Sequence, residues 1–156
     1  LRDGLTSLHN RHHLVAELPR LMADTEAKGI PLTLIVVDID HFKKINDQHG
    51  HARGDEVLVE VAEILRSVVR PQQLLVRYGG EEFVLVLPGT TTMQAGLGAE
   101  RLREKIAAAN PAGLPVTASI GIATLKPGES YDQLFSRADA ALYEAKRGGR
   151  NQVVSG

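Results

Sequence analysis

Apolar residues recur along the chain in patterns that predict alternating helices and strands. Ahead of residue 29 they repeat at helical spacing, at Leu14, Leu18, Leu21 and Met22. Gly29-Ile30-Pro31 interrupts that pattern, and residues 32–37 then form a short β-branched run that is typical of a buried strand. A short helix is predicted over residues 42–49, and a longer one from about Gly54 to Val69.

A β-hairpin is predicted near the middle of the chain, where residues 74–76 and 83–87 are two apolar runs. Gly79-Gly80 lies between them and suits a two-residue turn, because glycine adopts the positive φ angles that such a turn requires. Two carboxylates, Glu81 and Glu82, follow at once. Taken alone, this sequence is more often a solvated acidic hairpin, and a metal site beside a phosphate is the alternative.

The rest of the chain predicts two helices and two strands. Residues 90–92 can cap a helix that reaches about Ala109 and turns three residues inward, Leu97, Leu102 and Ile106. Residues 116–125 alternate between apolar and polar and predict a strand. A last helix, Tyr131–Arg147, stops at Gly148-Gly149, and residues 153–154 predict an edge strand. The core-facing residues of that helix are Leu134, Phe135, Ala138, Leu142 and Ala145.

These elements predict one α/β (α+β) domain over residues 1–156, with a single central, mostly antiparallel sheet flanked by helices. The formal net charge of -1 leaves no basic excess, so we expect no nucleic-acid partner. The absence of cysteine excludes disulfides and thiolate metal sites. No apolar run approaches the roughly 20 residues that span a bilayer, so no membrane contact is expected from this domain. Because the chain begins at Leu1, we expect a module whose sensory or regulatory region lies outside it.

Four carboxylates are candidates for a metal site. Asp38 and Asp40 close the first strand and project to the same side if the strand persists through them. Beside Glu81 and Glu82 on a neighbouring hairpin they would form an all-oxygen cluster, which suits Mg²⁺ or Mn²⁺ rather than zinc. Two ions about 3.5–4 Å apart could activate an attacking hydroxyl and stabilise a leaving oxygen in phosphoryl transfer. For Asp40 alone, capping of the next helix is an equally good explanation.

Two groups of cations accompany these acids. Phe42 and Lys43 open the short helix, whose free backbone N–H groups form an anion site with Lys43 as a charge partner for phosphate. A solvated face is the alternative for the Lys43-Lys44 pair. Three more cations, Lys146, Arg147 and Arg150, gather at the end of the last helix, where they can equally complement the helix dipole.

Several separated motifs occur in a fixed order. The central ones are Asp38-x-Asp40-x-Phe42-Lys43-x-x-Asn46-Asp47, Gly50-His51-x-x-Gly54-Asp55 and Arg77-Tyr78-Gly79-Gly80-Glu81-Glu82-Phe83. The two ends carry Asp3-x-Leu5-Thr6-x-Leu8-x-Asn10-Arg11 and Ala138-Asp139-x-Ala141-Leu142-Tyr143-x-Ala145-Lys146. In order and spacing these motifs resemble the GGDEF family of diguanylate cyclases over essentially the whole chain.

The resemblance implies a nucleotidyl-cyclase fold of the polymerase-palm type and a cytoplasmic enzyme, even where the full-length protein is tethered to a membrane. Two such domains would each hold one GTP and meet as a homodimer. The 3′-hydroxyl of each GTP would attack the α-phosphate of the other, giving cyclic di-GMP and two pyrophosphates. Asp38, the Ile39 carbonyl and Glu81 would bind Mg²⁺ or Mn²⁺, two ions in each site, and Glu82 would complete the shell. Glu81 would also accept the proton, and Lys43 would stabilise the transition state.

The family pattern also implies how the nucleotide is held. Guanine lies between Asn46 and Asp55, and Asp55 can only accept hydrogen bonds, which suits the ring N–H and amino group of guanine. Loss of either partner should weaken discrimination against ATP. His51 matches a substrate-contacting position, although a turn residue is an equal explanation. The backbone at Phe42 would cradle the triphosphate, and two cations, Lys146 and Arg150, match phosphate-contacting positions.

Two departures from the family pattern stand out. Many members carry Arg-x-x-Asp before the hairpin, where product binds and inhibits, but this chain has Arg70-Pro71-Gln72-Gln73. Gln73 offers no carboxylate and Pro71 stiffens the turn, which argues against feedback inhibition there. In the opening motif Ser7 replaces the usual Gly and His12 the second Arg, and neither touches the metal cluster.

An active diguanylate cyclase is the leading hypothesis, because every acid that the reaction needs is present in residues 79–83 and at Asp38. A non-catalytic GTP- or cyclic-di-GMP-binding regulatory module is the alternative, although such members typically lose these acids. Another nucleotidyl cyclase using the same two-metal chemistry is a third possibility, and the Asn46–Asp55 pair argues against an adenine substrate.

Overall fold

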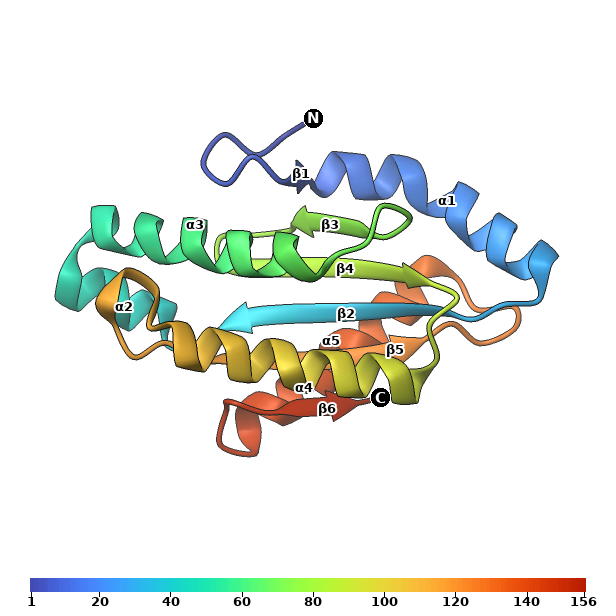
Figure 1. Ribbon diagram of the computed structural model, residues 1–156. Coiled ribbons are helices and arrows are strands. Elements are labelled where there is room, and N and C mark those ends of the chain that lie inside the picture. The colour runs from blue at the N-terminus through green and yellow to red at the C-terminus, as the bar shows by residue number, and fades with distance from the viewer.

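The computed structural model describes all 156 residues and contains a six-stranded sheet with helices on both faces (Figure 1). In spatial order the strands run β1-β3-β4-β2-β5-β6. They are β1 (His9–Asn10), β2 (Leu32–Ile39), β3 (Leu74–Arg77), β4 (Glu82–Pro88), β5 (Ala118–Thr124) and β6 (Val153–Ser155). The helices are α1 (Arg11–Lys28), α2 (Phe42–His49), α3 (His51–Val68), α4 (Thr92–Ala109), the 3₁₀ turn η1 (Pro111–Gly113) and α5 (Tyr131–Arg147).

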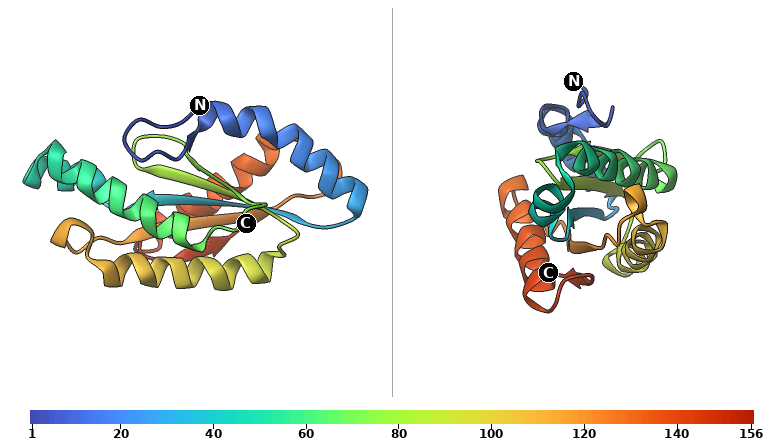
Figure 2. Two further views of the ribbon diagram at one scale, coloured as in Figure 1. Left: turned by 45° about the horizontal axis from the view of Figure 1, so that its top comes forward. Right: turned by 90° about the vertical axis from the view of Figure 1, so that its left-hand side faces the viewer.

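Each face of the sheet is covered by its own pair of helices. On β2, Ile35 and Val37 belong to the apolar cluster beneath α3 and α4, whereas Leu34 and Val36 belong to the cluster beneath α1 and α5. Figure 2 shows α5 and the α3–α4 pair on opposite sides of the sheet. Because side chains alternate along a strand, this register sends Asp38 to the α5 side. None of the helices combines the length and hydropathy needed to cross a bilayer.

The sheet is mixed, which corrects the expectation of a mostly antiparallel sheet. The central pairs β3–β4, β4–β2 and β2–β5 are antiparallel, but the edge strands β1 and β6 run parallel to their neighbours β3 and β5. A parallel partner must be reached by a crossover, and α5 supplies it between β5 and β6. Apolar periodicity identifies a strand without specifying the direction of its partner, and for this reason the expectation was wrong.

The loop between β3 and β4 also differs from the expected two-residue turn. Four residues, 78–81, separate the strands, and neither Gly79 nor Gly80 has a positive φ. The N–H groups of Tyr78 and Gly79 both donate to the Glu82 carbonyl, at 2.8 and 3.2 Å, and close the loop. Both glycines are exposed, so the tip of this 78–81 loop presents bare backbone to solvent.

Two helices differ in detail from the sequence pattern. α3 begins at His51 rather than Gly54, because Gly50, with φ 87°, bends the chain sharply and helical geometry resumes directly after it. Leu97 of α4 is 59% exposed rather than turned inward. The residues of α4 that reach the core are Ala95, Ala99, Leu102 and Ile106. The small alanines occupy the inward positions that the pattern had given to Leu97.

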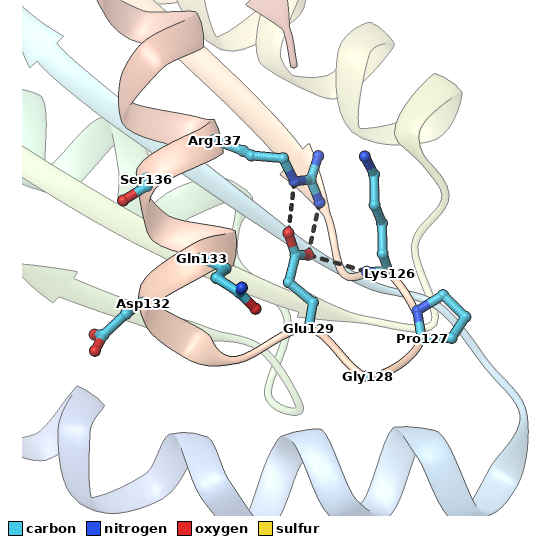
Figure 3. A pocket seen from close by; sticks show the side chains of 8 residues that line it. All are labelled: Lys126, Pro127, Gly128, Glu129, Asp132, Gln133, Ser136 and Arg137. Carbon is cyan, nitrogen blue, oxygen red and sulfur yellow. Dashed lines mark hydrogen bonds and ion pairs between the residues drawn. The ribbon is translucent and has the colours of Figure 1, made fainter.

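An open, polar cavity of about 610 Å³ lies beside the start of α5 (Figure 3). Its ion pair joins Arg137 to Glu129 at 2.7 Å, and Arg137 also donates to the Thr124 carbonyl. The hydrogen bond from Arg137 lowers the pKa of Glu129 to about 2. Thr124 pairs with Thr33 at the start of β2, so this cavity lies at the opposite end of the sheet from Asp38. We interpret the pair as a clamp between the end of β5 and α5.

Gly121 of β5 lies directly against α5 and provides a test of this packing. A Cβ at Gly121 would lie 2.3 Å from the Ala138 carbonyl oxygen and 2.4 Å from the Leu142 nitrogen. Gly121→Ala should therefore lower the free energy of unfolding by about 3 kcal/mol, because α5 must lift away from the sheet.

Urea unfolding measures this effect. Gly98→Ala is the matched control, since Gly98 lies in α4 and a methyl group added there would meet no other atom within 4 Å. It should raise the free energy of unfolding by about 0.5–1 kcal/mol. A Gly121→Ala variant as stable as the wild type would contradict the close approach of α5 to the sheet.

Candidate functional site

An acidic pair lies at the carboxyl end of β2. Asp38 of β2 and Glu82 of β4 are cross-strand partners, so their side chains stand side by side on the α5 face. The adjacent residues are joined through the backbone, where the Ile39 N–H donates to the Glu81 carbonyl at 3.2 Å. The sheet register therefore brings all four of the predicted metal-binding residues to one strand end.

A cation from α5 already contacts this pair. The Lys146 ammonium donates to Asp38 Oδ2 at 2.9 Å, and the Asp38 side chain is only 10% exposed. Burial raises the pKa of Asp38, and Lys146 opposes that shift. Burial, followed by the charges of Asp38 and Asp139, raises the pKa of Glu82 to about 7. Lys146 therefore does not offset the burial and crowding of these carboxylates.

A divalent cation fits the donors that are present here. No three acidic or histidine side chains lie close enough to hold a metal ion by themselves. Mg²⁺, however, commonly takes one or two protein carboxylates and completes its shell with water and substrate phosphates. The crowded charges of Asp38 and Glu82 are of the kind that such an ion neutralises. The Ile39 side chain is a buried hydrocarbon without a donor atom, so only the backbone carbonyl of this residue could serve as a ligand.

Asp40 is neither a helix cap nor a free member of the acidic cluster. The N-cap of α2 is His41, and its side chain makes no capping bond. Asp40 is 4% exposed and accepts hydrogen bonds from the Thr117 and Ser119 hydroxyls and from the Asn151 N–H. The explanation of Asp40 as a helix cap is therefore wrong, whereas a contact between Asp40 and a metal ion stays a prediction.

The first turn of α2 follows directly after β2 and is open to an anion. No side chain caps it, so its leading N–H groups are available. Phe42 packs against the core and anchors this turn. The Lys43 side chain is 89% exposed and pairs with Asp47 at 2.9 Å, a surface contact that holds it weakly. Lys43 is therefore free to move toward a bound phosphate.

The helices α2 and α3 meet closely at the Gly50 elbow. A Cβ on Gly54 would lie 1.8 Å from Asn46 Oδ1, so only glycine allows the two helices to pack this way. Asn46 Oδ1 is buried and has no hydrogen-bond partner. Asp55 and His51 are exposed at the start of α3. An unpartnered buried acceptor beside an exposed carboxylate suits a ligand that donates hydrogen bonds.

The two C-terminal cations lie in the last turn of α5 and in the tight turn that follows it. Lys146 occupies the last turn of α5 and contacts Asp38. Arg150 lies four residues later with φ 64°, and its N–H donates to the Ala145 carbonyl at 3.0 Å. This hydrogen bond holds Arg150 beside the C-terminal end of α5, four residues after Lys146, which contacts Asp38.

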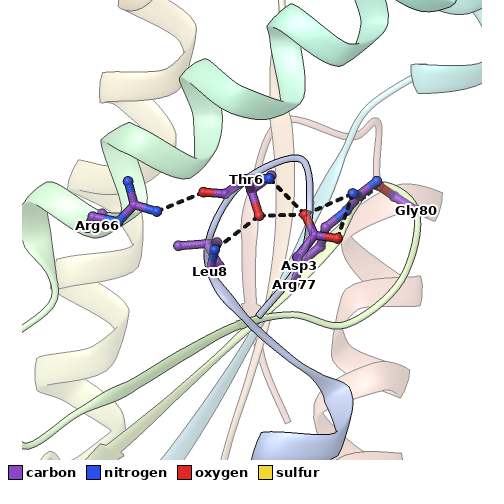
Figure 4. A network of polar contacts seen from close by, with 6 residues as sticks. All are labelled: Asp3, Thr6, Leu8, Arg66, Arg77 and Gly80. Carbon is purple, nitrogen blue, oxygen red and sulfur yellow. Dashed lines mark hydrogen bonds and ion pairs between the residues drawn. The ribbon is translucent and has the colours of Figure 1, made fainter. Parts of the chain in front are cut away.

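A network that sequence reasoning missed ties the 78–81 loop to the N-terminal turn (Figure 4). Arg77 Nη1 contacts both Asp3 carboxylate oxygens at 3.1 Å, and Arg77 Nη2 donates to the Gly80 carbonyl at 2.7 Å. Asp3 also accepts from the Thr6 N–H and hydroxyl, each at 2.8 Å. Ser7, where the family pattern has Gly, adopts φ 62°. The opening motif and Arg77 were both visible in the sequence, but their contact was not.

The Arg70–Gln73 segment, which departs from the family pattern, is closed by a hydrogen bond between its first and last residues. Gln73 Oε1 accepts a hydrogen bond from the Arg70 N–H at 2.9 Å. Both residues line a groove of about 490 Å³ against α4, together with Arg101 and Lys105. The groove holds three cationic side chains and no carboxylate.

Comparison with known proteins places this geometry in a family. Residues 1–152 match the family described as "Diguanylate cyclase, GGDEF domain". The response regulator PleD of Caulobacter vibrioides is 45% identical over 159 residues, and diguanylate cyclase DgcM of Escherichia coli is 43% identical over 154. These alignments cover 97% and 98% of this chain but 35% and 38% of the relatives, so the chain spans little more than a third of their length.

Solved structures give the same result. The GGDEF domain of DgcB from Caulobacter crescentus, in complex with c-di-GMP, superposes with a TM-score of 0.94 at 41% identity, covering 99% of this chain and 92% of that one. An active GGEEF domain of a diguanylate cyclase from Vibrio cholerae gives a TM-score of 0.89 at 36% identity, covering 95% and 97%. By its fold, its motifs and its relatives, this chain belongs to the family of diguanylate cyclase GGDEF domains.

Proposed function

We propose that this domain is an active diguanylate cyclase that condenses two GTP into cyclic di-GMP and two pyrophosphates. The observation that carries the proposal is the pairing of Asp38 with Glu82 at a strand end. The adjacent 78–81 loop retains the glycines and the acid of the family motif. The relatives named as diguanylate cyclases support it, as does the active domain from Vibrio cholerae, whose GGEEF sequence this chain shares.

The reaction requires two copies of the domain. In each half-reaction the 3′-oxygen of one GTP forms a bond to the α-phosphorus of the other, the bond to the β-phosphate bridging oxygen breaks, and pyrophosphate leaves with that electron pair. The hydroxyl proton must be accepted at the site. A homodimer facing its two nucleotides toward each other satisfies this stoichiometry, and it is therefore part of the proposal.

Mg²⁺ or Mn²⁺, two ions per site, would supply Lewis acidity toward the attacking hydroxyl and the phosphate oxygens. Asp38, the Ile39 carbonyl and Glu81 would bind these ions, and Glu82 would complete the donor set. Glu81 would position the hydroxyl and take up its proton. Lys43 would move from Asp47 to the phosphoryl oxygens as their charge increases. These acids at a central hairpin agree with a polymerase-palm type of nucleotidyl-transfer site.

The α2–α3 elbow would select the base. Asn46 Oδ1 lacks a partner and Asp55 can only accept hydrogen bonds, whereas guanine offers a ring N–H and an amino group as donors. His51 would contact the same ligand from the start of α3. The free N–H groups at Phe42, with Lys146 and Arg150, would hold the triphosphate. A GTP substrate agrees with a cytoplasmic location for the domain.

Loss of the Glu81 carboxylate should abolish synthesis. Glu81→Ala should lower the rate of cyclic di-GMP formation from GTP and Mg²⁺ by at least about 100-fold, and excess EDTA should do the same to the wild type. The product is identified by mass, at protein concentrations that allow dimers to form.

Glu63→Ala is the control, because Glu63 is an exposed α3 residue with no hydrogen bond or ion pair, and it should keep full activity. Undiminished product from Glu81→Ala would refute the assigned role. Nucleotide binding by the wild type with no product at any protein concentration would instead favour a non-catalytic regulatory module.

Base selection is tested at the elbow. Asp55→Ala should lower the preference for GTP over ATP about 10- to 100-fold, because a charged acceptor for the guanine edge is lost. Competition binding of the two nucleotides measures this preference. The neighbouring exposed Glu56→Ala should leave it unchanged, and unchanged selectivity in Asp55→Ala would remove Asp55 from the guanine site.

Product inhibition should be absent at the Arg70–Gln73 turn, because Gln73 contributes no carboxylate there. Gln73→Asp should introduce inhibition at cyclic di-GMP concentrations that leave the wild type unaffected. Gln72→Asp adds the same charge one position away and serves as the control. Initial-rate measurements with added product decide the matter, and inhibition of the wild type that Arg70→Ala relieves would contradict the expectation.

A further inference from the structure

Asp40 is a buried carboxylate that the proposed chemistry does not use. It is 4% exposed and forms no ion pair. The Ser119 hydroxyl donates to Oδ1 at 2.6 Å, while the Thr117 hydroxyl and the Asn151 N–H donate to Oδ2 at 2.7 and 3.0 Å. A buried charge without a cationic partner is costly, so an apolar residue would serve stability better. The carboxylate therefore calls for a reason other than stability.

The donors of Asp40 join two segments that are far apart in the sequence. Ser119 lies at the start of β5 and Thr117 directly precedes that strand, whereas Asn151 lies in the turn after α5. The Asp40 N–H completes the junction by donating to the Thr117 carbonyl at 2.9 Å. One side chain at the end of β2 thus fixes the C-terminal turn against the strand end that carries Asp38.

The turn that Asp40 holds is strained. Three consecutive residues, Gly149, Arg150 and Asn151, have φ angles of 116°, 64° and 47°, and two of them are not glycine. A second contact holds the same turn from α4, where Arg103 Nη1 donates to Asn151 Oδ1 at 2.8 Å. Left-handed residues of this kind persist where their surroundings over-determine them, and they cluster at functional sites.

We propose that Asp40 is a positioning residue, which holds the 148–151 turn so that Arg150 and Lys146 face the triphosphate. This inference rests on the proposed function, because it needs a triphosphate between those cations and the α2 N-terminus. Arg150 lies inside the strained turn, and Lys146 is the penultimate residue of α5, just before that turn begins. Asp40 acts through these cations and touches no substrate itself.

The test compares two ligands of the same base. Guanosine α,β-methylene triphosphate cannot lose its pyrophosphate, and with Mg²⁺ it reports triphosphate binding without turnover, whereas guanosine reports the base site alone. Asp40→Asn keeps the side-chain shape but replaces the charged carboxylate by a neutral amide, which weakens the hydrogen bond that Asp40 accepts from the Asn151 N–H. It should weaken the triphosphate analogue about tenfold in calorimetry and leave guanosine affinity unchanged. In turnover, KM for GTP should rise more than kcat falls.

A double-mutant cycle separates positioning from general damage. Arg150→Ala should lower the affinity for the analogue. In a protein that already carries Arg150→Ala, Asp40→Asn should lower this affinity little further, because Asp40 acts through the turn that carries Arg150. The inference would be overturned if the two substitutions lowered the binding free energy of the analogue additively. It would also be overturned if Asp40→Asn weakened guanosine and the analogue equally. A wild type that binds guanosine but not the analogue would overturn both the inference and the proposed function.

The turn can also be released from the opposite side, should Asp40→Asn fail to fold. Arg103→Ala removes the bond to Asn151 from α4 without disturbing β2, and it should weaken the analogue several-fold with guanosine unaffected. Glu100→Ala is the matched control, since it removes the other partner of Arg103 and leaves Asn151 bonded. If Arg103→Ala folded normally and bound the analogue as tightly as the wild type, the positioning role of Asp40 would be contradicted.

Discussion

The antiparallel pairing of β2 with β4 is the interaction on which the site depends. Its register places Asp38 opposite Glu82 and sets the Ile39 N–H against the Glu81 carbonyl. A slip of one residue would send Asp38 to the apolar α3–α4 face, where a carboxylate could not be solvated. Because β2 is buried along its whole length, the cost of moving Asp38 to that apolar face opposes the slip, which links core packing to the position of the acids.

Polar groups around this strand end combine crowded negative charge with cations from elsewhere in the chain. Burial and the charge of Asp38 raise the pKa of Glu82 to about 7, and Lys146 neutralises part of this charge from α5. Arg77 ties the N-terminal turn to the 78–81 loop, and Asp40 ties the C-terminal turn to the end of β2. Both junctions join segments that are far apart in the sequence, so exposed loops keep a defined position beside a rigid sheet.

Much of the element order and the candidate ligands could be predicted from residues alone. The helix spacing around Leu14, the β-branched run before Asp38 and the capped start of α4 are local signals, because they depend on periodicity and on side chains within one turn. The motif containing Glu81 and Glu82 carried the family resemblance without any knowledge of contacts. Such features survive in the sequence because neighbouring residues produce them.

Features that depend on distant partners appeared only in the tertiary structure. Strand direction at the two sheet edges, the exposure of Leu97 and the geometry of the 78–81 loop all follow from what packs alongside. Asp40 shows the reason most clearly. As a residue after a strand it fits a cap or a metal ligand equally well, and only the approach of Ser119 and Asn151 from remote segments decides what its oxygens bind.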